Sequence, residues 1–190
     1  MQSFPYVQPP HAAGFRDPLE TKAADWIRPW DGRESLVAGL IGLPLSKASI
    51  SHSGASFAPA AVRAAMKSFT TFSLEYNTEL ADLPVRVLGD IQMHVTDLAD
   101  CRRRIHAALL AVFQSMPDTP MLLLGGDHSV SFPSVRAFAE AHPGKTIGLL
   151  HFDAHHDVRS IEPGGLTNGT PIRSILESGA VEGRNIVQIG

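Results

Sequence analysis

Short apolar runs alternate with longer segments of helical spacing from residue 36 onward. The apolar runs are residues 36–40, 85–88, 121–124, 146–152 and 185–189. The intervening pattern predicts helices over about residues 58–68, 97–114, 131–141 and 171–178. Asp97 is a suitable N-cap, and Pro171 suits the first position of a helix. The alternation indicates βαβ units and therefore an α/β fold whose parallel strands are buried on both faces.

The first part of the chain follows a different pattern. Residues 1–31 contain five prolines and no apolar periodicity, and Trp26 and Trp30 are the anchors that we expect there. We therefore predict two parts, an irregular arm over residues 1–35 and an α/β domain over residues 36–190.

Composition narrows the class of protein. The 190 residues are 44% hydrophobic with a formal net charge of −3, and the longest basic stretch is residues 102–104, which argues against a nucleic-acid partner. The longest apolar run is far shorter than the roughly 18 residues that span a membrane. Cys101 is the single cysteine, which excludes an internal disulfide and a thiolate zinc cluster. We expect a cytoplasmic protein that acts on a small molecule.

Ionisable residues gather directly after two of the apolar runs. Residues 125–129 read GGDHS, and residues 151–157 read HFDAHHD. Ligands of open α/β sheets bind beyond the carboxyl ends of the strands, so both clusters lie where a site is expected. Asp153, His155 and Asp157 are spaced two apart, which in extended backbone points them to one side, and the two glycines let His128 approach.

This set of side chains predicts a metal site. Carboxylates and imidazoles without thiolate suit Mn²⁺, Fe²⁺ or Zn²⁺, and the oxygen-rich balance favours Mn²⁺. A lone histidine is usually a hydrogen-bonded core residue, but so many ionisable groups at a strand end need compensating cations. We expect Asp153 to bridge two ions about 3.5–4 Å apart that activate a water for hydrolysis. For His151 and His156 we expect a hydrogen bond behind the ligands or ordinary packing rather than direct ligation. We expect His151 to be structural and leave His156 open.

The two motifs resemble those of the ureohydrolase family, which includes arginases, agmatinases and formimidoylglutamases. Residues 42–58, 89–97 and 153–173 resemble formimidoylglutamases in particular. The resemblance implies a three-layer α/β/α fold with a mainly parallel sheet. It also implies a hydrolase with two Mn²⁺ that cleaves N-formimidoyl-L-glutamate to L-glutamate and formamide in histidine degradation. Homo-oligomers are common in the family, and this point stays open.

Two positions separate the members of the family. Asn168 stands before Gly169-Thr170-Pro171, where arginases and agmatinases carry a histidine. Arg159 stands where arginases carry an asparagine, and its guanidinium could grip a substrate carboxylate in a bidentate manner. We expect both residues to bind substrate, with a surface position for Arg159 and a turn role for Asn168 as alternatives. The hydroxyl-rich loop of residues 49–56 is expected at the mouth of the site.

The resemblance also implies how the ligands divide between the two ions. His128, Asp153 and Asp157 serve one ion, Asp153 and His155 serve the other, and Asp127 orients His128 from behind. The family's third motif, DxD, completes both shells and does not occur here, so we expect an N-terminal part of the enzyme. Two alternatives stay open: a hydrolase of guanidino substrates, and an inactive metal-binding fragment.

Overall fold

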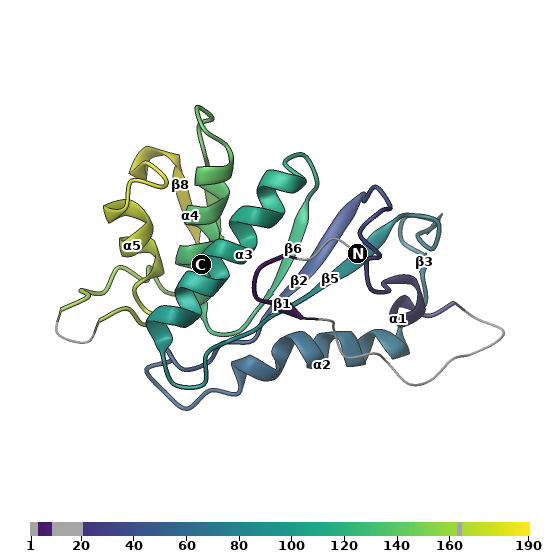
Figure 1. Cartoon of the computed structure of the whole chain (residues 1–190), viewed down its shortest axis with the longest axis horizontal. Coiled ribbons are helices and arrows are strands. Elements are labelled where there is room, and N and C mark those ends of the chain that lie inside the picture. The colour runs from purple at the N-terminus through teal and green to yellow at the C-terminus, as the bar shows by residue number, and fades with distance from the viewer. Residues whose placement is uncertain (1–3, 9–20, 163–164) are drawn as a thin grey trace.

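A computed structural model of the chain describes residues 4–8, 21–162 and 165–190. Its main sheet contains three parallel strands in the order β5 (Val85–Ile91), β2 (Ala38–Leu43) and β6 (Met121–Gly125) (Figure 1). A short strand, β1 (Val7–Gln8), pairs antiparallel with β5 at one edge. The α/β class and the parallel pairing agree with the prediction.

A second parallel pair, β7 (Leu149–Phe152) and β8 (Ile186–Ile189), stands apart from this sheet. Within the described residues β7 does not pair with β6, although one helix, α4 (Ser131–Ala141), connects them along the chain. A cavity of about 430 Å³ lies between α4, β6 and β7. Strand order along the chain therefore does not give strand order in space.

Helices cover both faces of the main sheet. Ile41 belongs to the core cluster that includes the apolar side of α3 (Leu98–Ser115). The next residue, Gly42, faces Pro59 of α2 (Ala58–Ala65) on the other side. Successive residues of a strand point to opposite faces, so α2, the sheet and α3 form three layers.

The prediction for α3 holds nearly to the residue. Asp97 is its N-cap, and the carboxylate accepts a hydrogen bond of 2.9 Å from the backbone N–H of Asp100. Cys101, Ile105 and Leu109 lie four residues apart and are fully buried. This apolar stripe binds the helix to the sheet.

The remaining elements are short. They are α1 (Ala23–Trp26), η1 (Ala55–Phe57), η2 (Met66–Ser68), β3 (Phe72–Ser73), β4 (Thr78–Glu79), η3 (His128–Val130), α5 (Pro171–Glu177) and η4 (Gly183–Asn185). No helix among the described residues combines the length and the apolar character needed to cross a membrane.

The predicted arm is more regular than its composition indicated. Its described parts include β1 and α1, while residues 1–3 and 9–20 lie outside the described residues. The indole N–H of Trp26 donates to the carbonyl of Leu83, and Trp30 stacks on Phe4 with ring centroids 6.0 Å apart. The backbone of β1 gains hydrogen bonds from β5, an effect that local sequence does not reveal.

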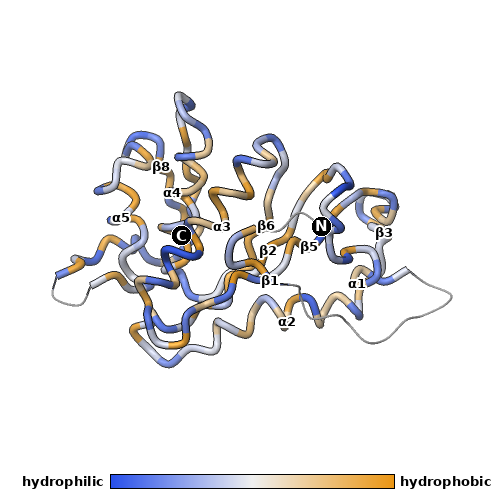
Figure 2. Tube along the Cα trace, in the orientation of Figure 1, coloured by the Kyte–Doolittle hydropathy of each residue, from blue (hydrophilic) through white to orange (hydrophobic). Residues whose placement is uncertain are grey.

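The prediction that the parallel strands are buried on both faces is correct for β2 and wrong for β6, β7 and β8. Hydrophobic residues concentrate along β2, β5 and β6 in the middle of the molecule (Figure 2). In β6, β7 and β8, however, alternate residues such as Leu122, Leu150 and Val187 are more than half exposed. Each of these strands therefore leaves a large apolar side chain exposed on one face.

A buried ion pair joins α2 to β5. The guanidinium of Arg63 donates to both carboxylate oxygens of Asp90, and the two side chains are only 9% and 10% exposed. A Cβ at Gly42 would lie 1.9 Å from one of these oxygens, so the carboxylate fills the space above that glycine. The pair fixes the helix on the sheet.

Replacing Asp90 with Asn should destabilise the chain by about 3–5 kcal/mol, because the Arg63 charge would stay buried without its partner. Urea unfolding measures the loss. The exposed pair of Arg184 and Glu182 provides the control, since Glu182→Gln should cost about 1 kcal/mol or less. Equal effects of the two changes would contradict the argument.

His142 ends α4 and should make stability depend on pH. Its ring lies 2.8 Å from the carbonyl of Phe138 and 3.1 Å from that of Pro117, and these contacts raise the pKa of His142 above its usual 6.5. The stabilisation is complete below that value and is lost as the pH rises through the higher folded-state pKa. His142→Ala should therefore lower the free energy of unfolding more at about pH 5.5 than at about pH 9. A loss that is constant with pH would contradict this.

Candidate metal centre

Four ionisable side chains converge at the carboxyl ends of β6 and β7. They are His128 in η3, His151 and Asp153 at the end of β7, and Asp157 in the loop that follows. One potential ligand atom from each lies within 4.8 Å of the others. The structure thus brings together three of the predicted ligands, His128, Asp153 and Asp157, and adds a fourth residue, His151.

The turn after β6 explains how His128 reaches this point. A Cβ at Gly126 would lie 1.8 Å from the carbonyl oxygen of Leu45, so only glycine permits the close approach of the two backbones. The backbone N–H of Asp127 donates to the same carbonyl at 2.6 Å. His128 then begins η3 with its ring directed toward β7.

Asp157, in the loop after β7, contacts His128 directly. Its carboxylate Oδ2 lies 2.5 Å from Nδ1 of His128. Its φ of 50° is in the left-handed region, which non-glycine residues rarely adopt. This turn of the backbone directs the carboxylate toward His128. Backbone conformations that cost conformational energy often occur at functional sites. The loop is therefore not extended throughout, as the two-residue spacing had indicated.

Asp153 faces two sides at once. Its Oδ2 lies 3.7 Å from Nδ1 of His128, whereas its Oδ1 lies 3.2 Å from Nδ1 of His155. The backbone N–H of His155 also donates to Oδ1 and, with the three neighbouring imidazoles, holds the pKa of the Asp153 carboxyl below its usual range. One carboxylate with an imidazole at each oxygen is the arrangement expected of a residue that bridges two ions.

His155 lies outside the four-residue cluster. Its side chain is 81% exposed and contacts the site only through Asp153. His156 also lies near the surface, with Nδ1 3.2 Å from Oε1 of Gln188. Ligation by His155 stays a prediction.

His151 was not among the predicted ligands, and the structure places it beside them. Its ring stacks on His128 with centroids 5.0 Å apart, and its Nε2 lies 3.6 Å from Oδ2 of Asp153. The available signal was its position two residues before Asp153, which in a strand places both on one face.

Asp127 supports the site through the backbone. Its carboxylate accepts from the backbone N–H groups of Ala48 and Ser129, at 3.1 and 3.0 Å, and from the hydroxyl of Ser129. These bonds connect the turn that carries His128 to the loop after β2. An orienting effect on His128 stays a prediction, and it would act through this turn.

A second loop closes over the same region. The backbone N–H of Asn168 donates to the carbonyl of Ala48, and its Oδ1 accepts from the N–H of Ile50 at 3.1 Å. The backbone N–H of Arg159 donates to Gly169, and the stem of Arg159 lies over this glycine. The side chain of Arg159 is exposed. Both predicted substrate residues therefore lie in one cross-linked loop next to Asp157.

The residues present fit a divalent cation. Two carboxylates and a histidine offer unshared electron pairs in one place, without thiolate. The side chains of Asp153 and Asp157 are partly exposed, at 27% and 12%, so a cation could reach both carboxylates. A cavity of about 420 Å³ next to His128 and His151 leaves room on the side of β6 and α4.

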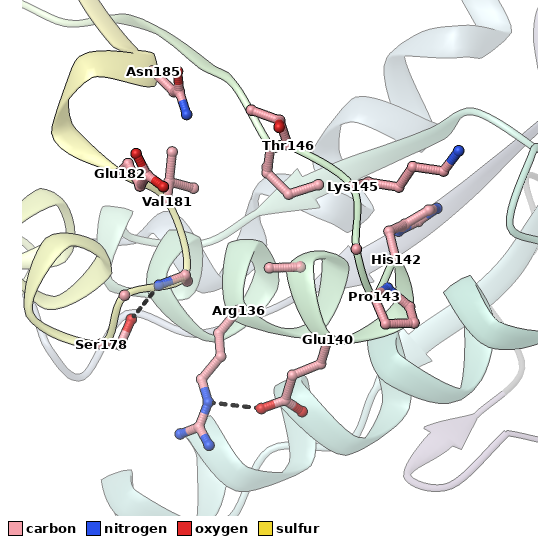
Figure 3. A pocket seen from close by; sticks show the side chains of 15 residues that line it. Arg136, Glu140, His142, Pro143, Lys145, Thr146, Ser178, Val181, Glu182 and Asn185 are labelled. Atoms are coloured by element: carbon pink, nitrogen blue, oxygen red, sulfur yellow. Dashed lines mark hydrogen bonds and ion pairs between the residues drawn. The ribbon is translucent and has the colours of Figure 1, made fainter.

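A larger pocket of about 660 Å³ lies elsewhere, where β7 and β8 begin (Figure 3). Arg136 and Glu140 of α4 form an ion pair along its wall, and Glu182 and Asn185 line it from the other side. The cluster with His128 lies where the strands end. The pocket is therefore separate from the metal centre.

The fold and the cluster define an α/β protein with a carboxylate–imidazole metal centre at the strand ends. Residues 37–190 match the Arginase family, and the chain belongs to this family.

Individual members of the family differ in how similar they are to the chain. It is 48% identical over 190 residues to the formimidoylglutamase of Halalkalibacterium halodurans and 41% identical to that of Bacillus subtilis, covering 100% of this chain and 59% of each relative. The agmatinase of Gallus gallus is 33% identical over 83% of this chain and 46% of that protein.

Solved structures give the same placement. The crystal structure of the Bacillus subtilis formimidoylglutamase has a TM-score of 0.87 at 43% identity, over 94% of this chain and 55% of that chain. Trypanosoma cruzi formiminoglutamase, crystallised with Mn²⁺, shares the fold with a TM-score of 0.75 at 23% identity, over 90% of this chain and 57% of that chain. The chain thus spans less than two thirds of these relatives.

Proposed function

We propose that the full-length protein is a manganese-dependent hydrolase that converts N-formimidoyl-L-glutamate to L-glutamate and formamide. The observation that carries this proposal is the convergence of His128, Asp153 and Asp157 within 4.8 Å at the strand ends. The high identity to two formimidoylglutamases supports the substrate. A cytoplasmic location and a role in histidine degradation belong to the same proposal, and oligomerisation is left open.

The proposed metal is Mn²⁺, which the structure of the Trypanosoma cruzi relative contains. His128, Asp153 and Asp157 would hold one ion, and Asp153 with His155 would contribute to a second. When bound, such ions lower the pKa of water and polarise the substrate. The chain covers 59% of the two formimidoylglutamases, so this proposal assigns only the ligands that the chain itself contains.

The residues of this chain would position the metal ligands and the substrate. Oδ2 of Asp153 faces His128 and Oδ1 faces His155, so Asp153 would contribute to both ions, and the turn at Asp127 would hold His128 opposite it. Arg159 is proposed to bind a carboxylate of the substrate, since it is exposed beside Asp157. Because Oδ1 of Asn168 is occupied by Ile50, a contact of Asn168 with the substrate would use its Nδ2 amide hydrogens.

Hydrolysis of a guanidino substrate is the second candidate within the family, supported by the 33% identity to an agmatinase. Arg159 favours the first candidate, because a dicarboxylate gives its guanidinium a partner that agmatine lacks. A third reading, a metal-binding fragment without activity, applies to the 190-residue chain alone. Assays of N-formimidoyl-L-glutamate, arginine, agmatine and guanidinobutyrate, with bound manganese counted in the same sample, separate the three.

Alanine at His128, Asp153 or Asp157 of the full-length protein should reduce turnover and bound manganese by at least about 100-fold, because each change removes a proposed ligand. His155→Ala should chiefly deplete one ion of the pair. His106, which pairs with Glu140 on the helices, is the matched control, and His106→Ala should leave the metal content unchanged. Full activity in any two of the ligand variants would refute the assignment.

Arg159→Ala should raise the KM by about tenfold and change kcat little, since it removes ground-state binding. Asn168→Asp keeps the acceptor for Ile50 but replaces an amide donor with a negative charge. If Asn168 donates to a substrate carboxylate, Asn168→Asp raises the KM more than Asn168→Ala does. The opposite order would show that Asn168 only anchors the loop.

A further inference from the structure

The imidazole of His151 is fixed by an amide behind it. Nε2 of Gln188 in β8 lies 2.9 Å from Nδ1 of His151 and donates to the carbonyl oxygen of His156 at 3.0 Å. Oε1 of Gln188 lies 3.2 Å from Nδ1 of His156. One glutamine side chain therefore contacts two histidines and a backbone carbonyl.

These contacts determine the orientation of the Gln188 amide. A carbonyl oxygen accepts hydrogen bonds and never donates them, so the amide atom facing the carbonyl of His156 must be the NH₂ group. The second hydrogen of that NH₂ group points toward Nδ1 of His151. Turning the amide over would place Oε1 against the carbonyl of His156, with two acceptors in contact.

The tautomer of His151 follows. Nδ1 receives a donor, so Nδ1 is the nitrogen without a proton and Nε2 carries one. The Nε2–H group thus points toward Asp153.

The environment of Nε2 shows that this donor lacks an acceptor. Nε2 is buried without a hydrogen-bond partner among the described residues, and the side chain of His151 is only 10% exposed. Oδ2 of Asp153 lies 3.6 Å from Nε2, which is too long for a hydrogen bond. A buried N–H without a partner is costly, so a small movement of the carboxylate would be favourable.

We propose that His151 is a positioning residue that holds Asp153 through Nε2–H, and that it is not a metal ligand. A ligand nitrogen must be free of its proton, and Nε2 would meet that condition only if Gln188 ceased to donate to Nδ1. Instead, the chain Gln188–His151–Asp153 fixes the carboxylate whose oxygens face the two proposed ions. His151 acts through Asp153.

Nitrogen NMR of the metal-free 190-residue chain tests the tautomer directly. A long-range ¹H–¹⁵N correlation spectrum connects each ring nitrogen to the carbon-bound protons Hδ2 and Hε1. In a neutral ring, the nitrogen without a proton resonates well downfield of the protonated nitrogen. We expect the downfield signal at Nδ1 of His151. A downfield signal at Nε2, or none at either nitrogen, would overturn the proposal.

Gln188→Glu reverses the hydrogen bond, because a carboxylate accepts and draws the proton to Nδ1. The downfield signal should then move to Nε2. Gln188→Met removes the donor without adding charge and should give a mixture of tautomers. Gln114→Glu, at an exposed position of α3, is the control for charge and should leave His151 unchanged. A His151 spectrum unaffected by Gln188→Glu would contradict the proposed role of the amide.

Manganese affinity of the full-length protein distinguishes a positioning residue from a ligand, and this measurement rests on the proposed function. If His151 holds Asp153, Gln188→Glu weakens Mn²⁺ binding by about 10–100-fold, because Nε2 then turns an electron pair toward the carboxylate. If His151 is a ligand, the same change preserves or tightens binding, and the proposal fails. Absence of manganese in the unmodified protein would refute the proposed function but leave the tautomer result standing.

Discussion

The site depends on bringing a histidine that follows β6 against two carboxylates that follow β7, although β6 and β7 do not pair with each other. Nδ1 of His128 lies 3.7 Å from Asp153 and 2.5 Å from Asp157. Neighbouring carboxylates repel, so contact with the imidazole favours the arrangement, and a cation would favour it further. A cation bound here would therefore affect both the chemistry and the stability of this region.

What holds the two strand ends together is a set of loop contacts rather than a sheet. Asp127 ties the turn after β6 to Ala48, and Asn168 ties the loop after β7 to the same residue. Ala48 is buried between them with both its N–H and its carbonyl bonded. Helix α4, which connects β6 to β7, packs on both α3 and α5 and so supports the two loops. A change at Ala48 or its partners would therefore alter the site without touching a ligand.

The sequence predicted what depends on local pattern. The strands β2, β5, β6, β7 and β8 and the helices α2 to α5 follow hydrophobic periodicity, and Asp97 caps α3. The convergence of His128 with Asp153 follows from parallel strands that end at one edge. Other features depend on partners distant in the sequence. The separation of β7 from β6 and the pairing of β1 belong to this group. The exposure of His155 is another, because the backbone bends at Ala154 and His155, where the alternation of β7 ends.

His151 shows where alternation holds and where it fails. Alternation was used to align Asp153, His155 and Asp157, which follow the strand, whereas His151 inside the strand was expected to be structural. Yet the rule holds best within β7, where His151 and Asp153 share a face, and it fails in the loop. Gln188 could not be inferred in this way, because only the parallel register of β7 with β8 places it opposite His151. The tautomer of a histidine at the metal centre is thus set by a residue 37 positions away in the chain.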